Sequence, residues 1–271
     1  MINFPNAKIN LGLRVIEKRS DGFHSLESVF YPVKLCDALE IIESKNKGAE
    51  LTISGIEIPG SKNENLCLRA YRLLSEDHTL PGIHIHLHKV IPTGAGLGGG
   101  SSDAAFFIKL MNEKFDLNIS WGEMHHYAKQ LGSDCSFFVT NRTAFVEGRG
   151  DSSEPIDVDL SKFRIGIVHP GIHIETRTAY EGVMPVKPKD SLEKKIIDLP
   201  ITKWKEHIKN DFETSLFLKY PLIEKVKEQF YSLGAIYASM SGSGSAVYGI
   251  FEKSIDLKKE FPGYFCWTDK M

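Results

Sequence analysis

Residues 92–105 read PTGAGLGGGSSDAA, a segment with five glycines in fourteen positions. Glycine has no Cβ, so it reaches positive φ and lets another group approach the backbone closely. Ser101, Ser102 and Asp103 are favourable N-cap residues, and the apolar run at 104–111 predicts a helix. A glycine-rich turn and a helix N-terminus together present N–H groups and a positive dipole end, so the segment predicts a phosphate-binding loop.

Two other phosphate-binding loops fit this segment poorly. The loop of nucleotide hydrolases ends in Gly-Lys-Ser/Thr, whereas here Gly100 is followed directly by Ser101. The dinucleotide fingerprint G-x-G-x-x-G is formally matched by Gly94, Gly96 and Gly99. It also needs a flanking βαβ unit and an acidic residue about 20 positions further on. Asp116 is near that distance, but it lies in a turn after a predicted helix, with no strand before it. A dinucleotide site is therefore disfavoured.

The whole-chain composition is that of an ordinary soluble protein, with 42% hydrophobic and 25% charged residues. With 271 residues the chain has length for one large or two moderate domains. A formal net charge of -2 favours neither nucleic acid nor a membrane surface as a partner. No apolar run approaches the ~20 residues that span a bilayer, and residues 1–10 lack the features of a signal peptide. We therefore expect a cytoplasmic protein, as a monomer or weak homodimer.

Cysteines and histidines give no strong signal for a metal or a disulfide. The cysteines are scattered without a C-x-x-C pair, which favours reduced thiols; they are Cys36, Cys67, Cys135 and Cys266. His84, His86 and His88 share one face of a predicted strand, which permits a metal site. A solvated strand face, alternating with buried apolar residues, explains the same pattern and is favoured.

Hydrophobic periodicity predicts an α+β fold. Expected strands are 8–16, 37–44, 48–54, 82–92 and 164–170, and expected helices are 65–76, 104–111 and 121–131. The last of these helices is expected to begin with Ser120 as its N-cap and Glu123 as the capping-box partner. Residues 133–151 are expected to alternate short strands with turns. A further helix should begin near Pro221 and end near Gly234, followed by strand, glycine turn and strand within 235–251. A polar stretch near 151–162 favours two domains, 1–155 and 156–271.

Three separated segments, in this order and spacing, resemble the GHMP kinases, the family of galactokinase and of homoserine, mevalonate and phosphomevalonate kinases. They are PNAKINLGL (5–13), the glycine loop with its two serines, and SMSGSGSAVYGIF (239–251). The resemblance implies a two-domain GHMP kinase fold. Its N-terminal α/β domain, of the ribosomal-protein-S5-domain-2-like type, would bind ATP and carry catalysis, and its C-terminal ferredoxin-like domain would contribute to the substrate cleft.

Further segments resemble one branch of this family, which phosphorylates a diphosphocytidyl sugar alcohol in the non-mevalonate route to isoprenoids. They are PNAKINLGLRVIEKRSDGFHSLESVF (5–30), NLCLRAYRLL (65–74), LGSDCSFFV (131–139), AFVEGRGD (144–151) and KNDFE (209–213). The likeness runs from Pro5 to about Phe251. It implies transfer of a phosphoryl group from ATP, with Mg²⁺, to the 2-hydroxyl of that alcohol.

The resemblance also implies the catalytic residues. Asp134 matches the family's catalytic aspartate, which would orient or deprotonate the substrate hydroxyl. Lys8 matches the lysine beside it, whose charge would lower the pKa of the aspartate and stabilise developing negative charge. Taken alone, Asp134 could equally cap a helix or turn. Whether it is a true base or an orienting group stays open.

The same resemblance assigns residues to ATP and the metal ion. The loop residues that would wrap the phosphates are Pro92, Gly94, Ala95, Gly96, Leu97, Gly98, Gly99, Gly100, Ser101 and Ser102, and either serine would hold Mg²⁺. Asn65 and Lys89 would lie near the adenosine, although an asparagine before a helix is commonly a cap and a lysine before a turn is commonly solvated. Gly242, with Gly244, would close the turn beside the phosphates, or form a plain hairpin turn.

Substrate recognition is expected to rest mainly on DGFH. By resemblance His24 would read the cytosine edge and Phe23 would stack on its ring, where many relatives have tyrosine. Asn10 would contact the substrate near the reacting hydroxyl. A second stacking aromatic is expected in residues 169–180, where the chain offers His173 and Thr176 but no phenylalanine or tyrosine before Tyr180, which leaves the second wall of the pocket open.

Two other readings remain. A different GHMP kinase, acting on mevalonate or a similar small alcohol, would keep the loop, Lys8 and Asp134 but would not need DGFH. A non-enzymatic member of the fold would bind its ligand without turnover; both catalytic residues are present, which disfavours it.

Overall fold

The computed structural model describes residues 1–271, and these form two compact units, each assembled from separate stretches of the chain. Unit 1 comprises residues 1–7, 35–93 and 98–142, and unit 2 comprises 8–34, 94–97 and 143–271. Because both units are discontinuous in sequence, they do not coincide with a division between residues 155 and 156. That division stays a prediction about functional domains.

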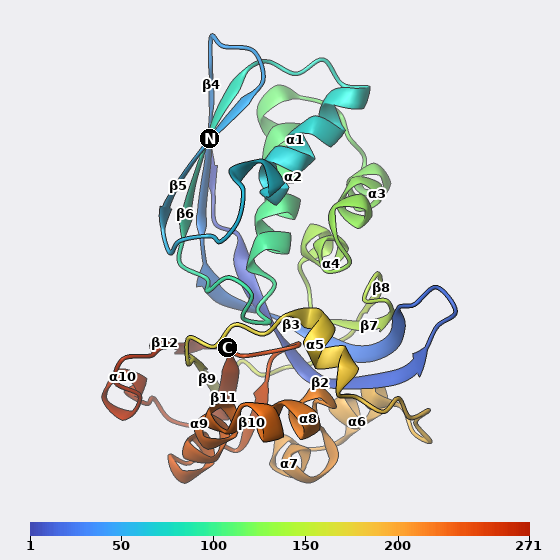
Figure 1. Cartoon of the computed structure of the whole chain (residues 1–271), viewed down its shortest axis with the longest axis vertical. Helices are drawn as coiled ribbons and strands as arrows, with labels where there is room; N and C mark the ends of the chain where they lie inside the picture. Colours follow the sequence, from blue (N-terminus) through green and yellow to red (C-terminus); the bar gives the residue numbers. More distant parts are fainter. The chain divides into compact units, whose positions relative to one another are not determined.

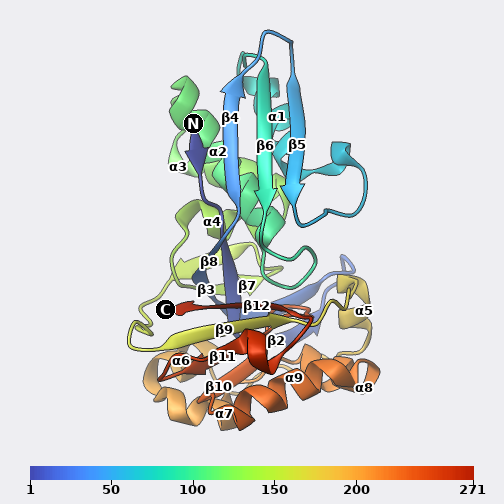
Figure 2. The same ribbon diagram turned by 90° about the vertical axis from the view of Figure 1, so that its left-hand side faces the viewer.

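Unit 1 contains one mixed sheet with helices against a single face. Its strand order is β1 (Ile2–Asn3), β4 (Ala38–Glu43), β6 (Ile83–Lys89), β5 (Ala49–Gly55). β4 pairs antiparallel and β5 parallel with the central β6. Figure 2 shows these three strands side by side in front of helices α1 and α2. The helices are η1 (Lys62–Glu64), α1 (Leu66–Asp77), α2 (Gly99–Phe115), α3 (Trp121–Leu131) and α4 (Cys135–Thr140).

Strand β6 shows the strict alternation expected of a sheet covered on one face. Ile83, Ile85 and Leu87 are fully buried beneath the helices. The histidines between them lie on the opposite face, where their ring nitrogens contact the hydroxyl groups of Thr52 and Ser54 on β5. This face therefore carries a polar ladder across two neighbouring strands.

Unit 2 contains two antiparallel four-stranded sheets (Figure 1). One has the order β2 (Asn6–Lys18), β3 (His24–Cys36), β7 (Ala144–Gly148), β8 (Ser152–Pro155). The other has the order β10 (Tyr237–Met240), β11 (Val247–Phe251), β9 (Arg164–His169), β12 (Phe265–Lys270). Strands β9, β10, β11 and β12, with helices after β9 and β11, give the β-α-β-β-α-β connectivity of a ferredoxin-like domain. The expected α+β class and ferredoxin-like domain are confirmed.

The helices of unit 2 are α5 (Thr176–Glu181), α6 (Leu192–Asp198), η2 (Ile201–Lys203), α7 (Trp204–His207), α8 (Phe212–Lys219), α9 (Pro221–Ser232) and α10 (Leu257–Glu260). Helices α5, α8, α9 and α10 share one hydrophobic core with strands of the second sheet. Proline opens α9, as expected, and the apolar face of this helix buries Ile223, Val226 and Phe230 against the sheet. None of the helices in the chain is both long and apolar enough to cross a membrane.

Two local expectations were wrong. Helix α2 begins at Gly99, so Ser101, Ser102 and Asp103 lie inside the helix rather than before it, and Gly98 at positive φ occupies the N-cap without a side-chain cap. The expected strand pattern after residue 133 fails over Cys135–Thr140, which is helical. A short apolar run between turn residues is consistent with a buried strand or a buried helix, and its period does not separate the two.

The start of α3 was correctly predicted and offers a test of local stability. Ser120 accepts a hydrogen bond from the Glu123 backbone N–H, and the Glu123 carboxylate accepts from the Ser120 N–H in return. We expect Ser120→Ala to lower the free energy of unfolding by about 1 kcal/mol in urea titrations, since an N–H group loses its acceptor. Glu113→Ala, an exposed change on α2, should lie within about 0.5 kcal/mol of wild type; an equal effect of both variants would contradict the capping role.

Candidate active site

The first half of the glycine loop, Gly94–Leu97, belongs to unit 2 and lies against the turn between β10 and β11. Gly96 has φ +78°, and a Cβ on it would lie 1.9 Å from the carbonyl oxygen of Ser241. The Ala246 N–H donates to the Ala95 carbonyl oxygen at 3.1 Å. Gly242, at φ +54°, approaches Gly96 from the other side. Two glycine-containing turns thus pack backbone against backbone, and a side chain at Gly96 would separate them.

The second half of the loop belongs to unit 1 and forms the start of α2. No side chain caps this helix, so the N–H groups of its first turn point out of the helix without a capping acceptor. A Cβ on Gly99 would lie 2.9 Å from Ile91, whereas one on Gly100 would meet its nearest neighbour, Leu66, at 3.8 Å. A long helix with a bare, glycine-lined N-terminus is suited to binding an anion.

A buried group of three charges holds the two ends of this loop. Lys89 lies at the end of β6 and donates to Asp37 and, at 2.7 Å, to Asp103 near the start of α2. Asp37 also accepts the backbone N–H groups of Val90 and Ile91, which lead into the loop. Because Lys89 pairs with one residue before the loop and another after it, the group fixes both ends of the loop.

Burial and charge shift the pKa values of this group in a consistent direction. Burial raises the pKa of the Asp103 carboxyl to about 7, and the neighbouring Lys89 charge opposes that rise. Burial alone would lower the pKa of Lys89, but the charges of Asp103 and Asp37 offset it, so the pKa is raised. The Lys89 ammonium is 3% exposed and neutralised by carboxylates. It is therefore buried rather than solvated, and its contact with adenosine stays a prediction.

Three other residues assigned to ATP or the metal lie in unit 1. Asn65 accepts the Cys67 N–H at 2.9 Å and is the N-cap of α1. Ser101 is half-buried, whereas Ser102 is fully buried and its hydroxyl oxygen has no hydrogen-bond partner in the structure. A buried hydroxyl without a partner carries a desolvation cost. A ligand or a water molecule could therefore supply the missing hydrogen bond to the Ser102 hydroxyl.

In unit 2, Lys8 contacts the glycine loop directly. Its Nζ donates to the Asn10 side-chain oxygen at 2.7 Å and to the Gly96 carbonyl oxygen at 3.0 Å, and it lies 4.5 Å from the centre of the Phe30 ring. The side-chain amide nitrogen of Asn10 donates to Ser28 at 2.8 Å. Both Lys8 and Asn10 are almost completely buried. Asn10 therefore holds the lysine, and its contact with a substrate stays a prediction.

Asp134, in unit 1, lies at the N-cap position of α4 but does not act as a cap. Its side chain makes no capping hydrogen bond to α4, and the Ser133 hydroxyl donates to its carboxylate at 3.4 Å. The residue is half-buried. The helix-cap alternative is therefore excluded for its carboxylate. Its catalytic role and its pairing with Lys8 stay predictions.

The hairpin between β2 and β3 carries the two residues expected to recognise a nucleobase. Phe23 is 52% exposed, and the guanidinium carbon of Arg149 lies 4.1 Å from its ring centre. His24 stacks on Tyr180 of α5, with ring centres 4.7 Å apart and planes inclined by 16°. Burial, with a smaller effect of the Lys18 charge, lowers the pKa of His24 and favours the neutral imidazole.

Tyr180 is an aromatic residue of this site to which the sequence analysis gives no role. It lies one helical turn after Thr176, the exposed first residue of α5. Recognising a helix over this segment would have made Tyr180 a candidate, because residues four apart share a helix face. His173, which was assigned to the substrate, instead approaches the glycine loop: its Nδ1 would lie 2.9 Å from a Cβ on Gly94. Contacts of Thr176 and His173 with a substrate stay predictions.

Comparison with known families matches two segments of the chain. Residues 65–142 match the model of the GHMP kinases N terminal domain, and residues 200–260 match that of the GHMP kinases C terminal. A protein from Bacteroides fragilis strain YCH46, named 4-diphosphocytidyl-2-C-methyl-D-erythritol kinase, is 48% identical, with 100% of both chains covered. The chain belongs to the GHMP kinase family.

Other GHMP kinases agree with this placement. A Cytophaga hutchinsonii protein of the same name is 52% identical, covering 93% of this chain and 92% of its own. A crystal structure of 4-(cytidine 5'-diphospho)-2C-methyl-D-erythritol kinase is 30% identical with a TM-score of 0.76, covering 92% and 89%. The Methanococcus jannaschii mevalonate kinase, at 17% identity and a TM-score of 0.70 over 100% and 98%, shares the fold.

The charge group behind the glycine loop predicts a pH-dependent stability. A carboxyl whose pKa is raised on folding binds more protons in the folded state, so its contribution to stability falls as pH rises from about 4 to about 7. In Asp103→Asn this fall should be absent. Urea unfolding at pH 4.5 to 8 should measure the free energy of unfolding of the variant minus that of wild type. This difference should increase with pH up to about 7 and stay constant above that pH. Parallel stability curves for the two proteins would contradict the raised pKa.

Proposed function

We propose that this chain transfers the γ-phosphoryl group of ATP to the 2-hydroxyl of 4-diphosphocytidyl-2-C-methyl-D-erythritol, a step in isoprenoid precursor synthesis. The observation that carries the proposal is the full-length similarity to relatives named for this substrate, at 48% and 52% identity. The mevalonate-type alternative is supported only by structures of lower identity, such as the 17% of the Methanococcus kinase, and these carry the fold alone.

The glycine loop is the proposed site for the ATP phosphates. Gly94, Gly96 and Gly98 lie at positive φ, and α2 adds its uncapped N-terminus. Such a surface neutralises a polyphosphate without a bulky side chain. The donor set also fits Mg²⁺, because this cation prefers oxygen ligands and keeps several waters, and the unpartnered hydroxyl of Ser102, or that of Ser101, would supply one oxygen. A bound Mg²⁺ would neutralise negative charge on the phosphates.

Lys8 and Asp134 are the proposed catalytic residues. Phosphoryl transfer depends mainly on positioning and on charge stabilisation in a loose transition state. A buried ammonium anchored to the loop carbonyl of Gly96 would stabilise charge that develops on the transferred group. The Asp134 carboxylate, which caps no helix, would orient the attacking hydroxyl and accept its proton.

The exposed aromatic residues of the β2–β3 hairpin are the proposed reader of the cytosine base. A base stacks well on an exposed phenyl ring such as Phe23. The neutral imidazole of His24 retains one donor and one acceptor nitrogen, which suits the edge of a cytosine. Tyr180, stacked on His24, would hold the imidazole plane in place. The substrates are small molecules, and we propose a cytoplasmic protein that works as a monomer or weak homodimer.

The proposal is tested by ATP turnover with Mg²⁺ when the purified protein is offered 4-diphosphocytidyl-2-C-methyl-D-erythritol, mevalonate and homoserine in parallel. ADP release with the cytidyl substrate alone is expected. Turnover with mevalonate or homoserine instead would keep the loop and the catalytic pair but overturn the substrate. Absence of turnover with all three would favour a binding protein of the same fold.

Replacing the proposed base gives a sharper prediction. Asp134→Ala should lower kcat by several powers of ten, while the affinity for ATP, measured by equilibrium binding, stays nearly unchanged. The reason is that the carboxylate acts on the acceptor hydroxyl rather than on the nucleotide. Ser133→Ala is the matched control, because it removes the neighbouring hydroxyl that contacts the same carboxylate and should cost little. A comparable loss of ATP affinity in Asp134→Ala would make Asp134 a structural residue.

A further inference from the structure

Ser241 contacts the glycine loop through its backbone, and its hydroxyl shares both acceptors of the Lys8 ammonium. The hydroxyl lies 2.9 Å from the Gly96 carbonyl oxygen and 3.4 Å from the Asn10 side-chain oxygen. These are the same two oxygens that accept from Lys8 Nζ at 3.0 and 2.7 Å. The single hydroxyl proton serves one acceptor at a time, and the shorter distance favours Gly96. The Gly96 carbonyl oxygen is therefore held by the ammonium and by the hydroxyl, and the Asn10 oxygen is the second acceptor within reach of both.

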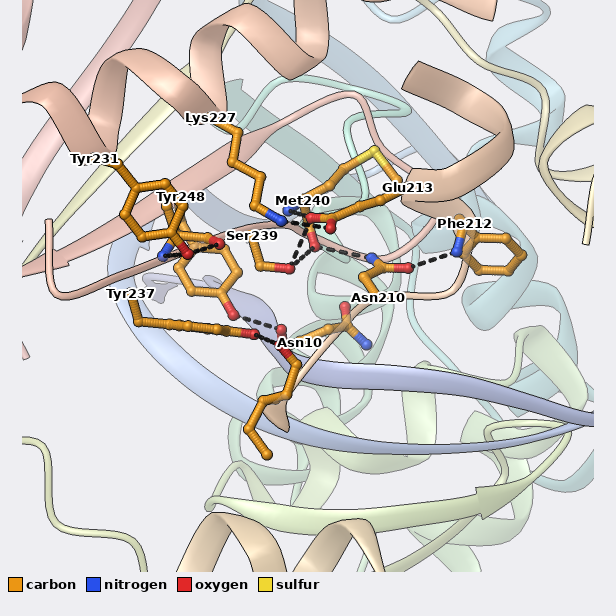
Figure 3. A network of polar contacts seen from close by, with 12 residues as sticks. Asn10, Asn210, Phe212, Glu213, Lys227, Tyr231, Tyr237, Ser239, Met240 and Tyr248 are labelled. Carbon is orange, nitrogen blue, oxygen red and sulfur yellow. Dashed lines mark hydrogen bonds and ion pairs between the residues drawn. The ribbon is translucent and has the colours of Figure 1, made fainter. Parts of the chain in front are cut away.

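Asn210 fixes the backbone on both sides of Ser241. Its amide nitrogen donates to the carbonyl oxygen of Met240 at 2.9 Å and to that of Gly242 at 2.8 Å. Its side-chain oxygen accepts the Phe212 N–H at 3.0 Å, which ties it to the start of α8. Figure 3 shows Asn210 between α8 and the end of β10. With Asn210 1% exposed and Ser241 fully buried, neither side chain has room for another arrangement.

A carboxylate fixes the strand that leads into this turn. Glu213 accepts the Ser239 hydroxyl at 3.0 Å and the Met240 N–H at 2.8 Å through one oxygen, and pairs with Lys227 at 2.5 Å through the other (Figure 3). The end of β10 is thereby held before Ser241 is reached. The network therefore extends from α8 and α9 to the glycine loop.

We infer that Ser241 is a positioning residue for Lys8, held in place by Asn210. Its hydroxyl keeps the Gly96 carbonyl and the Asn10 amide where they direct the ammonium. The inference rests on the proposed function, because it is the proposed catalytic role of Lys8 that would make this positioning matter for turnover. Loss of the hydroxyl leaves Lys8 its acceptors but frees them to move.

The test compares Ser241→Ala with Ser239→Ala, a matched control two residues away. Both changes remove one buried hydroxyl, but the Ser239 hydroxyl contacts Glu213 rather than an acceptor of Lys8. Ser241→Ala should lower kcat and kcat/KM together by roughly ten- to a hundredfold, with the KM for ATP unchanged, because a small misplacement of a catalytic group is costly. Ser239→Ala should stay within about threefold of wild type, and thermal unfolding should show that both variants fold.

A double-mutant cycle separates positioning from a general structural effect. In a Lys8→Met background, whose residual rate is measured in single turnovers, Ser241→Ala should cause no further loss of rate if it acts through the lysine. Equal rates for Ser241→Ala and Ser239→Ala, or losses that multiply in the double variant, would overturn the inference.

A measurement independent of turnover distinguishes failure of this inference from failure of the proposed function. Trace labelling with acetic anhydride, read by peptide mass spectrometry, reports how readily the Lys8 amine is reached. Labelling of Lys8 should rise severalfold in Ser241→Ala and stay at the wild-type level in Ser239→Ala. If wild type turns over none of the substrates but this difference is seen, the proposed function falls and the positioning stands. Equal labelling of Lys8 in both variants and wild type would overturn the inference that Ser241 positions Lys8.

Discussion

The close backbone contact between two glycine-containing turns is the constraint on which the proposed site depends. A Cβ on Gly96 would lie 1.9 Å from the Ser241 carbonyl oxygen, and no rearrangement of a flexible side chain could relieve that overlap. Because the two backbones meet, the Gly96 carbonyl comes within reach of both Lys8 Nζ and the Ser241 hydroxyl. The absence of a side chain at one position therefore determines where a buried charge can be placed.

The two buried lysines near the loop contact different parts of it. Lys89 donates to the carboxylates of Asp37 and Asp103, and these bonds fix the ends of the loop. Lys8 donates to the side-chain oxygen of Asn10 and the carbonyl oxygen of Gly96 and lies over the Phe30 ring. These contacts hold the Lys8 ammonium at a fixed point on the loop backbone, which suits a group proposed to act on phosphate.

The sequence predicted the local features whose cause is local, and missed those that depend on packing. The glycine loop, the capping box at Ser120 and the proline start of α9 follow from residues a few positions apart, and all three are present. The α2 boundary was misplaced because Ser101 and Ser102 are good caps, yet Gly98 adopts the left-handed conformation and the helix begins at Gly99 instead of Ala104. Tyr180 against His24, and Asn210 around Ser241, join residues far apart in the chain, and no period in the sequence brings them together.

Lys8 bonds to the loop both through its backbone N–H and through its side-chain ammonium, and the two bonds have separate roles. Its backbone N–H donates to the Leu97 carbonyl oxygen at 2.9 Å, while its side chain donates to the carbonyl oxygen of the preceding residue, Gly96, at 3.0 Å. Leu97 is the last loop residue of unit 2 before the chain continues into unit 1 at Gly98. The backbone bond anchors that crossing and is kept by any side chain at position 8. A long, costly, buried cationic side chain is therefore not needed to anchor the loop, and what it adds is a positive charge at a fixed point on the loop backbone.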